Sequence, residues 1–275
     1  TVGYLAGGGA GGASVMTGDN NTLIGREAGK LITTGNFNTA VGRDALTATT
    51  TGAENVAIGG NALDANTTAS FNVAIGTSAL GANTTGTNNV MVGTNAGDAI
   101  TTSNNNTGVG HDVLGATTTG DLNTAMGSTA LNTNTTGANN TGIGYAALTA
   151  NTTGTANTAV GVNAGAALTT GGYNVAVGRQ ALNATTTVND NVAVGNNALR
   201  LNTTGANNTG IGSSSLDANT TGVRNVAVGA LALSSNTTAN DNVAVGGGTS
   251  GVSFAALQSN TTGANNTAVG NGALG

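Results

Sequence analysis

The sequence contains no cysteine, no proline and no tryptophan, and it has a single histidine, His111. The absence of cysteine excludes a disulfide framework and a thiolate metal site, although it fits any cellular compartment. Charged residues make up only 6% of the chain, whereas a soluble globular domain carries about 25%. The six Lys and Arg residues are scattered and the net charge is −5, so a nucleic-acid-binding surface is not expected.

Long apolar runs are also missing. No stretch reaches the ~18 consecutive apolar residues of a transmembrane helix, so no membrane insertion is expected in this segment. Apolar residues nevertheless make up 38% of the chain, which suffices for a core and argues against disorder despite the 47 glycines. The chain begins at Thr1 without methionine, and we interpret it as a fragment or processed portion of a longer protein.

Glycine recurs at a fixed interval, at the end of a short run such as AVG or AIG. Successive glycines are 17 residues apart from Gly25 to Gly246, and the register resumes at Gly270 after a repeat that is longer by seven residues. The segment 134–144, NTTGANNTGIG, returns unchanged at 202–212, four repeats later. Taking this glycine as position 0 of every repeat, the fifteen glycines are Gly25, Gly42, Gly59, Gly76, Gly93, Gly110, Gly127, Gly144, Gly161, Gly178, Gly195, Gly212, Gly229, Gly246 and Gly270.

Several positions of the repeat admit few residue types. Position −3 is Thr or Val, position −1 is Val, Ile or Met, position +3 is nearly always Ala, and position +4 is usually Leu. Thr-Thr occupies +8 and +9 in nearly every repeat, and position +10 is usually Gly. Position −4 is Asn in all fifteen repeats, namely Asn21, Asn38, Asn55, Asn72, Asn89, Asn106, Asn123, Asn140, Asn157, Asn174, Asn191, Asn208, Asn225, Asn242 and Asn266.

The runs −3 to −1 and +4 to +9 alternate in residue type as strands do, and glycines at 0 and +10 separate them. The high content of Gly, Thr and Asn opposes a helix. One repeat cannot fold alone, but stacking flattened coils about 4.8 Å apart would pair their backbone groups. We therefore predict an all-β fold, a β-solenoid or β-roll of about 15 coils with a 17-residue period. A degenerate first coil with an insertion would occupy 1–20, the regular array 21–246, and a stretched coil with a final partial coil 247–275.

The distribution of charge predicts which positions face water. Charged residues fall at −6, −5, +1, +2 and +5, and they are absent from −4 to 0 and from +3, +4 and +6. Because a buried unpaired charge is costly, we predict that +5 is exposed. Alternation then places +4, +6 and +8 inside, together with −1 and −3 of the other strand, and leaves −2 outside. The charged residues at +5 are Lys30, Asp64, Asp98, Arg200 and Asp217.

The unbroken column of asparagine at −4 predicts an amide ladder. Identical side chains stacked at about 4.8 Å can form hydrogen bonds from each coil to the next. A plain turn residue that tolerates the left-handed conformation is the alternative.

Three repeats replace Leu at +4 by Gly, and the same three repeats carry an apolar residue at +7, where other repeats have Asn or Thr. We predict that the three apolar side chains point inward and fill the volume that the glycines leave. The pairs are Gly29 with Ile32, Gly97 with Ile100, and Gly165 with Leu168.

Position −2 lies on the predicted outer side of its strand and yet is never polar. A stripe of small apolar residues on an outer surface indicates that another molecule covers it, and a second copy of the chain is the expected cover. The predicted oligomer interface consists of Leu23, Ala40, Ala57, Ala74, Met91, Gly108, Ala125, Gly142, Ala159, Ala176, Ala193, Gly210, Ala227, Ala244 and Ala268.

The motifs NVAVG, NTAVG and NVAIG, followed two residues later by AL, resemble the head repeats of trimeric autotransporter adhesins, and they are similar to repeats in trimeric phage tail-fibre shafts. The resemblance covers residues 21–275 and is specific in the strand N-V/T-A-V/I-G. It implies a left-handed β-roll in which three parallel chains surround one axis on a bacterial surface or a virion. The present repeat is longer than the usual adhesin repeat, because it adds NTTG.

Catalytic chemistry has little support in the sequence. A Ser-His-Asp arrangement would rest on His111 alone, and His111 and Asp112 occupy the outer positions +1 and +2. The Gly-x-Gly motifs belong to the repeat, and the acidic residues do not form a calcium-binding repeat. Clustered carboxylates of the kind that glycoside cleavage needs are missing. We therefore expect no enzyme activity and no catalytic, cofactor or metal site.

The sequence predicts a non-catalytic structural and adhesive segment of an extracellular trimeric surface adhesin. The shaft of a phage tail fibre is one alternative. An ice-binding solenoid is another, because Asn or Thr at +7 and Thr at +9 would form two outward ladders. The expected partners are further copies of the chain, in a homotrimer, and an unknown surface receptor or glycan. Exposed loops at 247–253 and 7–16 are the candidates for receptor contact.

Overall fold

The computed structural model describes residues 2–7, 16–249, 251 and 254–274, and no helix occurs among them. Each strand is three residues long and occupies positions −3 to −1, so the strand predicted there is confirmed. The strands are β1 (Thr22–Ile24), β2 (Thr39–Val41), β3 (Val56–Ile58), β4 (Val73–Ile75), β5 (Val90–Val92), β6 (Thr107–Val109), β7 (Thr124–Met126), β8 (Thr141–Ile143), β9 (Thr158–Val160), β10 (Val175–Val177), β11 (Val192–Val194), β12 (Thr209–Ile211), β13 (Val226–Val228), β14 (Val243–Val245) and β15 (Thr267–Val269).

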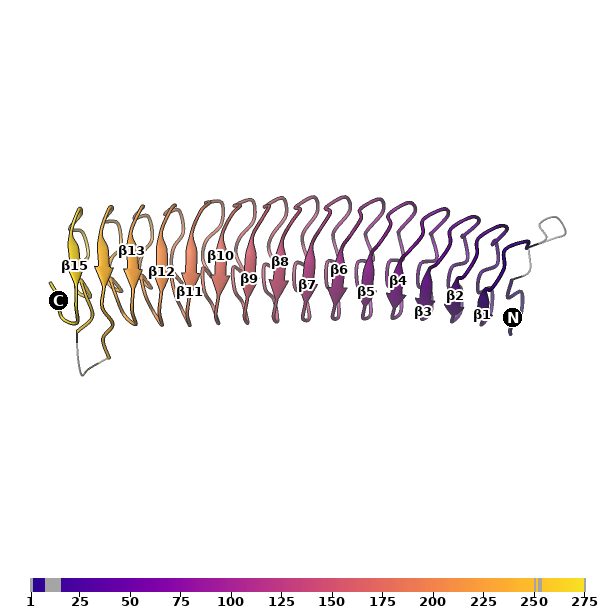
Figure 1. Cartoon of the computed structure of the whole chain (residues 1–275), viewed down its shortest axis with the longest axis horizontal. Helices are drawn as coiled ribbons and strands as arrows, with labels where there is room; N and C mark the ends of the chain where they lie inside the picture. Colours follow the sequence, from indigo (N-terminus) through magenta and orange to yellow (C-terminus); the bar gives the residue numbers. More distant parts are fainter. Residues whose placement is uncertain (1, 8–15, 250, 252–253, 275) are drawn as a thin grey trace. The chain divides into compact units, whose positions relative to one another are not determined.

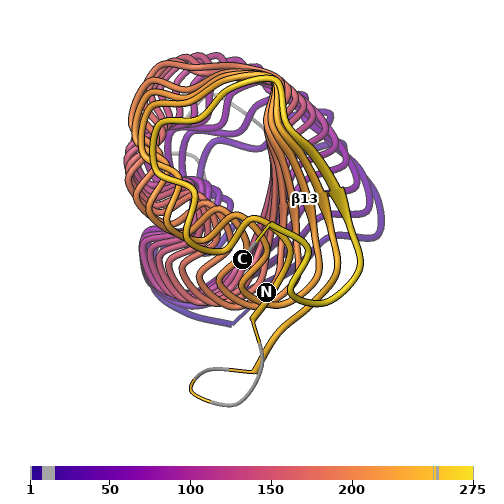
Figure 2. The same cartoon turned by 90° about the vertical axis from the view of Figure 1, so that its left-hand side faces the viewer.

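The chain divides into two compact units, Thr1–Ala138 and Asn139–Gly275. We call them the N-terminal unit, which holds β1 to β7, and the C-terminal unit, which holds β8 to β15 (Figure 1). In each unit one coil follows another along the chain, and each coil contributes one strand (Figure 1). Viewed along the stack, the strands form one side of the coils, and turns and loops form the rest (Figure 2).

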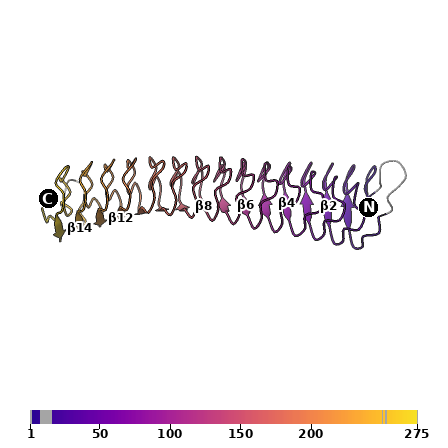
Figure 3. The same cartoon turned by 90° about the horizontal axis from the view of Figure 1, so that it is seen from above.

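Within each unit the strands follow one another in chain order (Figure 3), and every strand pairs in parallel with the next. Each residue lies opposite its own counterpart one repeat later. Ala40 lies opposite Ala57 in the N-terminal unit, and Ala176 lies opposite Ala193 in the C-terminal unit. The same register continues across the stretched repeat, where Val243 lies opposite Thr267. Equal positions of successive repeats therefore stand in columns, and the predicted parallel β-solenoid with a 17-residue period is confirmed.

Position 0 turns the chain out of the strand, and two constraints require glycine there. Gly59 has φ +140°, a conformation that residues with a Cβ rarely adopt. A Cβ added to Gly59 would also collide with the backbone of Gly76 in the next coil. The repeating glycine of the sequence is therefore a consequence of coil stacking.

The second strand, predicted for +4 to +9, does not form in any repeat among the described residues. In the repeat of Gly59, Asn61 and Leu63 have φ +59° and +50°, so positions +2 and +4 are left-handed. The N–H of Asn66 donates to the carbonyl of Leu63 at 3.2 Å, which closes a turn within the coil. The left-handed conformation of Leu63 costs about 1–2 kcal/mol, and full burial of the leucine offsets it. This half of the coil is therefore a chain of turns, and side chains do not alternate along it.

Positions −2, +3, +4 and +7 line the interior of each coil. Ala57, Ala62, Leu63 and Asn66 illustrate one coil, and all four are fully buried. The predicted phase of the strand was therefore wrong, because −2 faces inward while −3 and −1 face outward. Positions +6 and +8, predicted inside, are mostly half-buried, and so are the charged residues at +5, which were predicted to be exposed.

The interior has no room for a large residue at −2 together with a leucine at +4, which agrees with the corrected phase. The two repeats with a large residue at −2, Leu23 and Met91, both have glycine at +4. A Cβ on Gly29 would lie 2.6 Å from Leu23 Cδ2, and one on Gly97 would lie 3.1 Å from Met91 Sδ. Val and Ile at −3 and −1 escape this constraint because they lie on the outer side.

The predicted filling of the core at +7 is confirmed. Ile32, Ile100 and Leu168 are at most 2% exposed. A Cβ on Gly97 would lie 2.9 Å from Ile100 Cδ1, and one on Gly165 would lie 3.0 Å from Leu168 Cδ1. The side chains at +7 therefore occupy the space that a leucine at +4 fills in other coils.

Candidate interaction face

The predicted oligomer interface at −2 is wrong, because these residues lie inside the coils and cannot contact another molecule. Small residues are required there by the packing against +3 and +4. The residues concerned are all buried: Leu23, Ala40, Ala57, Ala74, Met91, Gly108, Ala125, Gly142, Ala159, Ala176, Ala193, Gly210, Ala227, Ala244 and Ala268.

The apolar surface of the molecule is instead the outer side of the strands, formed by positions −3 and −1 of β1 to β15, which we call the outer sheet face. Every side chain on it is Val, Ile, Met or Thr, and none is charged. All of these side chains are half-buried or exposed, and Ile58 and Met126 are 38% and 49% exposed. Sequence reasoning assigned these columns to the core, because it took the absence of charge as a sign of burial.

In each unit the outer sheet face is as large as the apolar patches that often form interaction sites. A three-residue strand is about 10 Å long and neighbouring strands are about 4.8 Å apart, so each coil adds about 50 Å² of sheet surface. The seven strands of the N-terminal unit thus present roughly 350 Å². Contiguous apolar patches of a few hundred Å² are often functional on soluble proteins.

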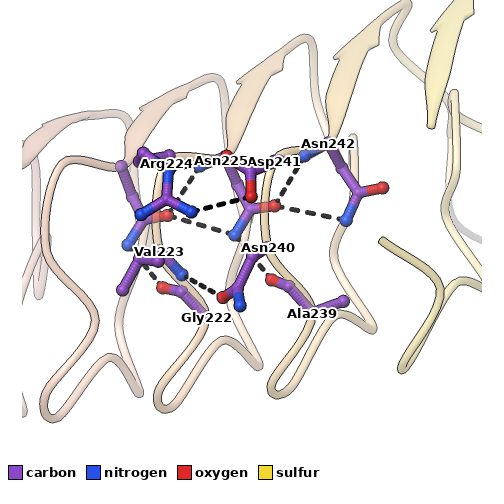
Figure 4. Close-up of polar contacts among 9 residues, drawn as sticks. Gly222, Val223, Arg224, Asn225, Ala239, Asn240, Asp241 and Asn242 are labelled. Atoms are coloured by element: carbon purple, nitrogen blue, oxygen red, sulfur yellow. Dashed lines mark hydrogen bonds and ion pairs between the residues drawn. The ribbon is translucent and has the colours of Figure 1, made fainter. Parts of the chain in front are cut away.

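The asparagine column at −4 forms the predicted ladder within each unit. The Oδ1 atom of Asn225 accepts hydrogen bonds from the backbone N–H and the Nδ2 of Asn242, at 3.1 and 3.3 Å (Figure 4). The Nδ2 of Asn225 also donates to the carbonyl of Ala239 at 2.8 Å, which ties the start of the strand to position +10 of the same coil. Most −4 amides therefore close their own coil in this way, and the −4 side chains also bind the next coil. The side chains are buried except at Asn21 and Asn266.

A second buried column at +7 was missed by the sequence analysis. The Nδ2 of Asn219 donates to Oδ1 of Asn202 at 2.8 Å, and that of Asn66 donates to Oγ1 of Thr49 at 3.1 Å. Threonine or asparagine at +7 is therefore inside, and the prediction of an outward ladder there is wrong. The ice-binding alternative keeps only the exposed threonines at +9, such as Thr68.

Most of the lysine and arginine side chains pair with acids on the outside of the coils. Arg200 and Asp217 occupy +5 in successive repeats and form a bidentate pair at 2.9 and 3.2 Å. Arg224 and Asp241 do the same at −5 (Figure 4), and the hydrogen bond from Arg224 lowers the pKa of Asp241. His111 lies on the surface with Nδ1 3.1 Å from Asp112 Oδ2.

Among the described residues no group of three or more His, Cys, Asp or Glu side chains is placed to hold a metal ion. The described part of the chain has no helix with the length and apolar character needed to cross a bilayer. The predicted receptor loops at 247–253 and 7–16 lie partly outside the described residues, and they stay a prediction.

No family model, no curated protein and no solved structure matches the chain.

Proposed function

We propose that the chain is a non-catalytic structural segment of an extracellular fibre, in which copies of the chain associate through the outer sheet face. The observation that carries the proposal is the composition of that face. Two outward positions in every strand are restricted to Val, Ile, Met and Thr, whereas other outward positions admit charge. A free surface has no physical reason to avoid charge so consistently, but a covered one does.

The internal structure supports a mechanical role. Each coil is bonded to its neighbours by backbone hydrogen bonds, by the −4 ladder and by threonine at +8, whose Oγ1 donates to the next coil, as from Thr50 to the carbonyl of Thr67 at 3.2 Å. Repeats of this kind extend a structure without any new packing problem, because each contacts only its neighbours. The residues that recur in every repeat serve the stack, and none of them forms a chemical site.

The resemblance of the N-V/T-A-V/I-G strand to adhesin heads supports a parallel homotrimer on a bacterial surface. A phage tail-fibre shaft is the alternative, since it would use the same face. Closure into a ring would cover the outer sheet face of every copy, and it would leave no apolar sheet surface to aggregate.

Light scattering on the intact chain tests this proposal. The expected mass is a multiple of 26.0 kDa, with three copies expected from the resemblance. Replacing Val177 and Val194 on the outer sheet face by Asp should give a folded monomer, because charge would be buried in the interface. The matched control places Asp at the exposed +9 positions of the same repeats, Thr187 and Thr204, and should keep the wild-type mass. A monomeric wild-type chain, or equal effects of the two changes, would refute self-association through this face.

A further inference from the structure

Two rows of exposed residues border the outer sheet face. Position −5 precedes the strand at one end, and position +1 follows the position-0 glycine at the other end. We call these rows the −5 rim and the +1 rim. Glu54 and Asp190 lie on the −5 rim, Arg43 and Arg179 lie on the +1 rim, and all four are exposed.

The two rims carry opposite charge. In all fifteen repeats the only charged residue type on the +1 rim is arginine, at Arg26, Arg43 and Arg179. The −5 rim carries three acids and one arginine, and that arginine, Arg224, is bonded to one of the acids, Asp241. The acids that remain on the −5 rim are Glu54 and Asp190.

The remaining charges have few partners in their own chain. Among the described residues Glu54, Asp190 and Arg179 take part in no ion pair. Arg43 contacts Asp44, which it shares with Arg26. Among the described residues no ion pair joins the two rims, because the three-residue strand, about 10 Å long, lies between them.

Each unpaired acid of the −5 rim lies at the same sequence offset from an arginine of the +1 rim. Glu54 follows Arg43 by 11 residues, and Asp190 follows Arg179 by the same 11 residues, so each acid lies one coil after its arginine. Successive coils are only about 4.8 Å apart, which the length of an arginine side chain spans. The two arrangements occur in different units and repeat the same geometry.

The symmetry that relates two copies determines which rim of the second copy lies beside each rim of the first. If two copies are related by rotation about an axis along the stack, the −5 rim of one meets the +1 rim of the other, and coils of equal number lie at the same level. If the copies run antiparallel, each rim meets itself and the order of coils is reversed. Only the parallel arrangement places the unpaired acids of the −5 rim beside the arginines of the +1 rim.

We propose that copies of the chain associate in parallel and in register, with Arg179 of one copy paired with Asp190 of its neighbour and Arg43 paired with the neighbour's Glu54. This inference rests on the proposed parallel association through the outer sheet face, and it adds the residues that pair and the register that they fix. The apolar face would supply affinity, and the rims would exclude antiparallel and shifted arrangements.

Charge reversal at Arg179 and Asp190 tests the pairing, because neither side chain has an ion-pair partner to lose in its own chain. The left-handed −5 position tolerates arginine, as Arg224 shows with φ +56°. Arg179→Asp and Asp190→Arg should each raise the concentration of half-association by about tenfold at low salt. The combined variant should recover the wild-type value, and Thr187→Asp should have no effect.

The outcomes separate this inference from the proposal on which it rests. If Val177→Asp with Val194→Asp dissociates the wild-type oligomer but the single reversals change nothing, or if the combined variant is the weakest, the parallel pairing is refuted while self-association stands. A monomeric wild-type chain refutes both. Loss of the single-variant effects at 1 M salt is also expected, because screening acts on exposed charges.

Discussion

The chain has two columns of buried asparagine, at −4 and at +7, and they differ in how much variation they allow. Position −4 is Asn in all fifteen repeats. Position +7 runs Ile32, Thr49, Asn66 and Asn83 through its first four repeats, and similar residues follow in the next eight. Both columns are buried and both form hydrogen bonds between coils, so burial and bonding alone do not explain the difference.

The difference lies in what depends on each amide. The Oδ1 of a −4 asparagine accepts the backbone N–H of the next −4 residue, as Asn38 does for Asn55 at 3.0 Å. No described backbone N–H of the next coil depends on +7 in this way, so threonine or an apolar residue can replace asparagine there. Where Ile100 follows Asn83, the Oδ1 of Asn83 is left without a partner, and the chain tolerates this. Position −4 is therefore invariant because a backbone N–H of the next coil needs its side-chain oxygen.

The largest effect is expected from breaking the −4 column. Asn55→Ala removes the acceptor of the Asn72 backbone N–H and the bond from Nδ2 to the carbonyl of Ala69. A buried N–H without a partner costs about 1–3 kcal/mol, and the lost bonds and cavity add to this. We expect the free energy of unfolding to fall by about 3–4 kcal/mol in urea titrations followed by circular dichroism. A loss below about 1 kcal/mol would contradict the role given to this column.

A double-mutant cycle tests whether the apolar residues in the +7 column fill the space left by glycine at +4. Leu168→Asn alone should leave a cavity, and Gly165→Leu alone should overpack the core, each costing about 2–3 kcal/mol. The double variant restores the usual coil, with Leu at +4 and Asn at +7, and should cost less than about 1 kcal/mol. Additive losses would show that the two positions do not share one space.

A smaller effect is expected at +7 itself. Asn66→Thr copies the residue of the preceding repeat, Thr49, and its hydroxyl can still accept from Asn83 Nδ2. The variant loses the bond from Asn66 Nδ2 to the carbonyl of Ala69, so a loss of about 1 kcal/mol is expected. If Asn66→Thr proved as damaging as Asn55→Ala in the same titration, the distinction between the columns would fail.

The smallest effect concerns Asp98 at +5, outside both columns. Burial raises the pKa of the Asp98 carboxyl, and the Asp112 carboxylate adds to the rise, although backbone hydrogen bonds oppose it. Because the folded pKa is raised, the ionised form destabilises the fold at neutral pH, and this penalty vanishes as the pH falls below the usual Asp value. Asp98→Asn should therefore raise the unfolding free energy at pH 7 by less than about 0.5 kcal/mol and give no gain at about pH 3. A gain that is larger at low pH would contradict this sign.

The fold could be predicted from the sequence where a feature repeats in every coil. The position-0 glycine predicted the period and the strand that precedes it, and the −4 asparagines predicted the ladder. The turns at +4 to +9 could not be predicted, because they depend on leucines such as Leu63 in a left-handed conformation that leucine rarely adopts.

The inward phase at −2 was also missed, although the sequence held a signal for it. Both −2 and −1 lack charge, so charge alone cannot tell which of them faces inward. The informative residues are the exceptions, Leu23 with Gly29 and Met91 with Gly97, where a large residue at −2 coincides with a missing side chain at +4. The position of the outer sheet face depends on this phase. The face could therefore be identified only from the structure.

Thiol labelling tests the central claim most directly, namely that −2 lies inside the coil while −1 lies on the face that a second copy covers. The chain has no cysteine, so single cysteines can be introduced at Ala193 and Val194 of the same strand. We predict that Ala193→Cys stays unreactive at every protein concentration until the chain unfolds. Val194→Cys should react in dilute monomer and become protected as the concentration rises. Rapid labelling of the native Ala193→Cys variant, or concentration-independent protection of Val194→Cys, would contradict the account.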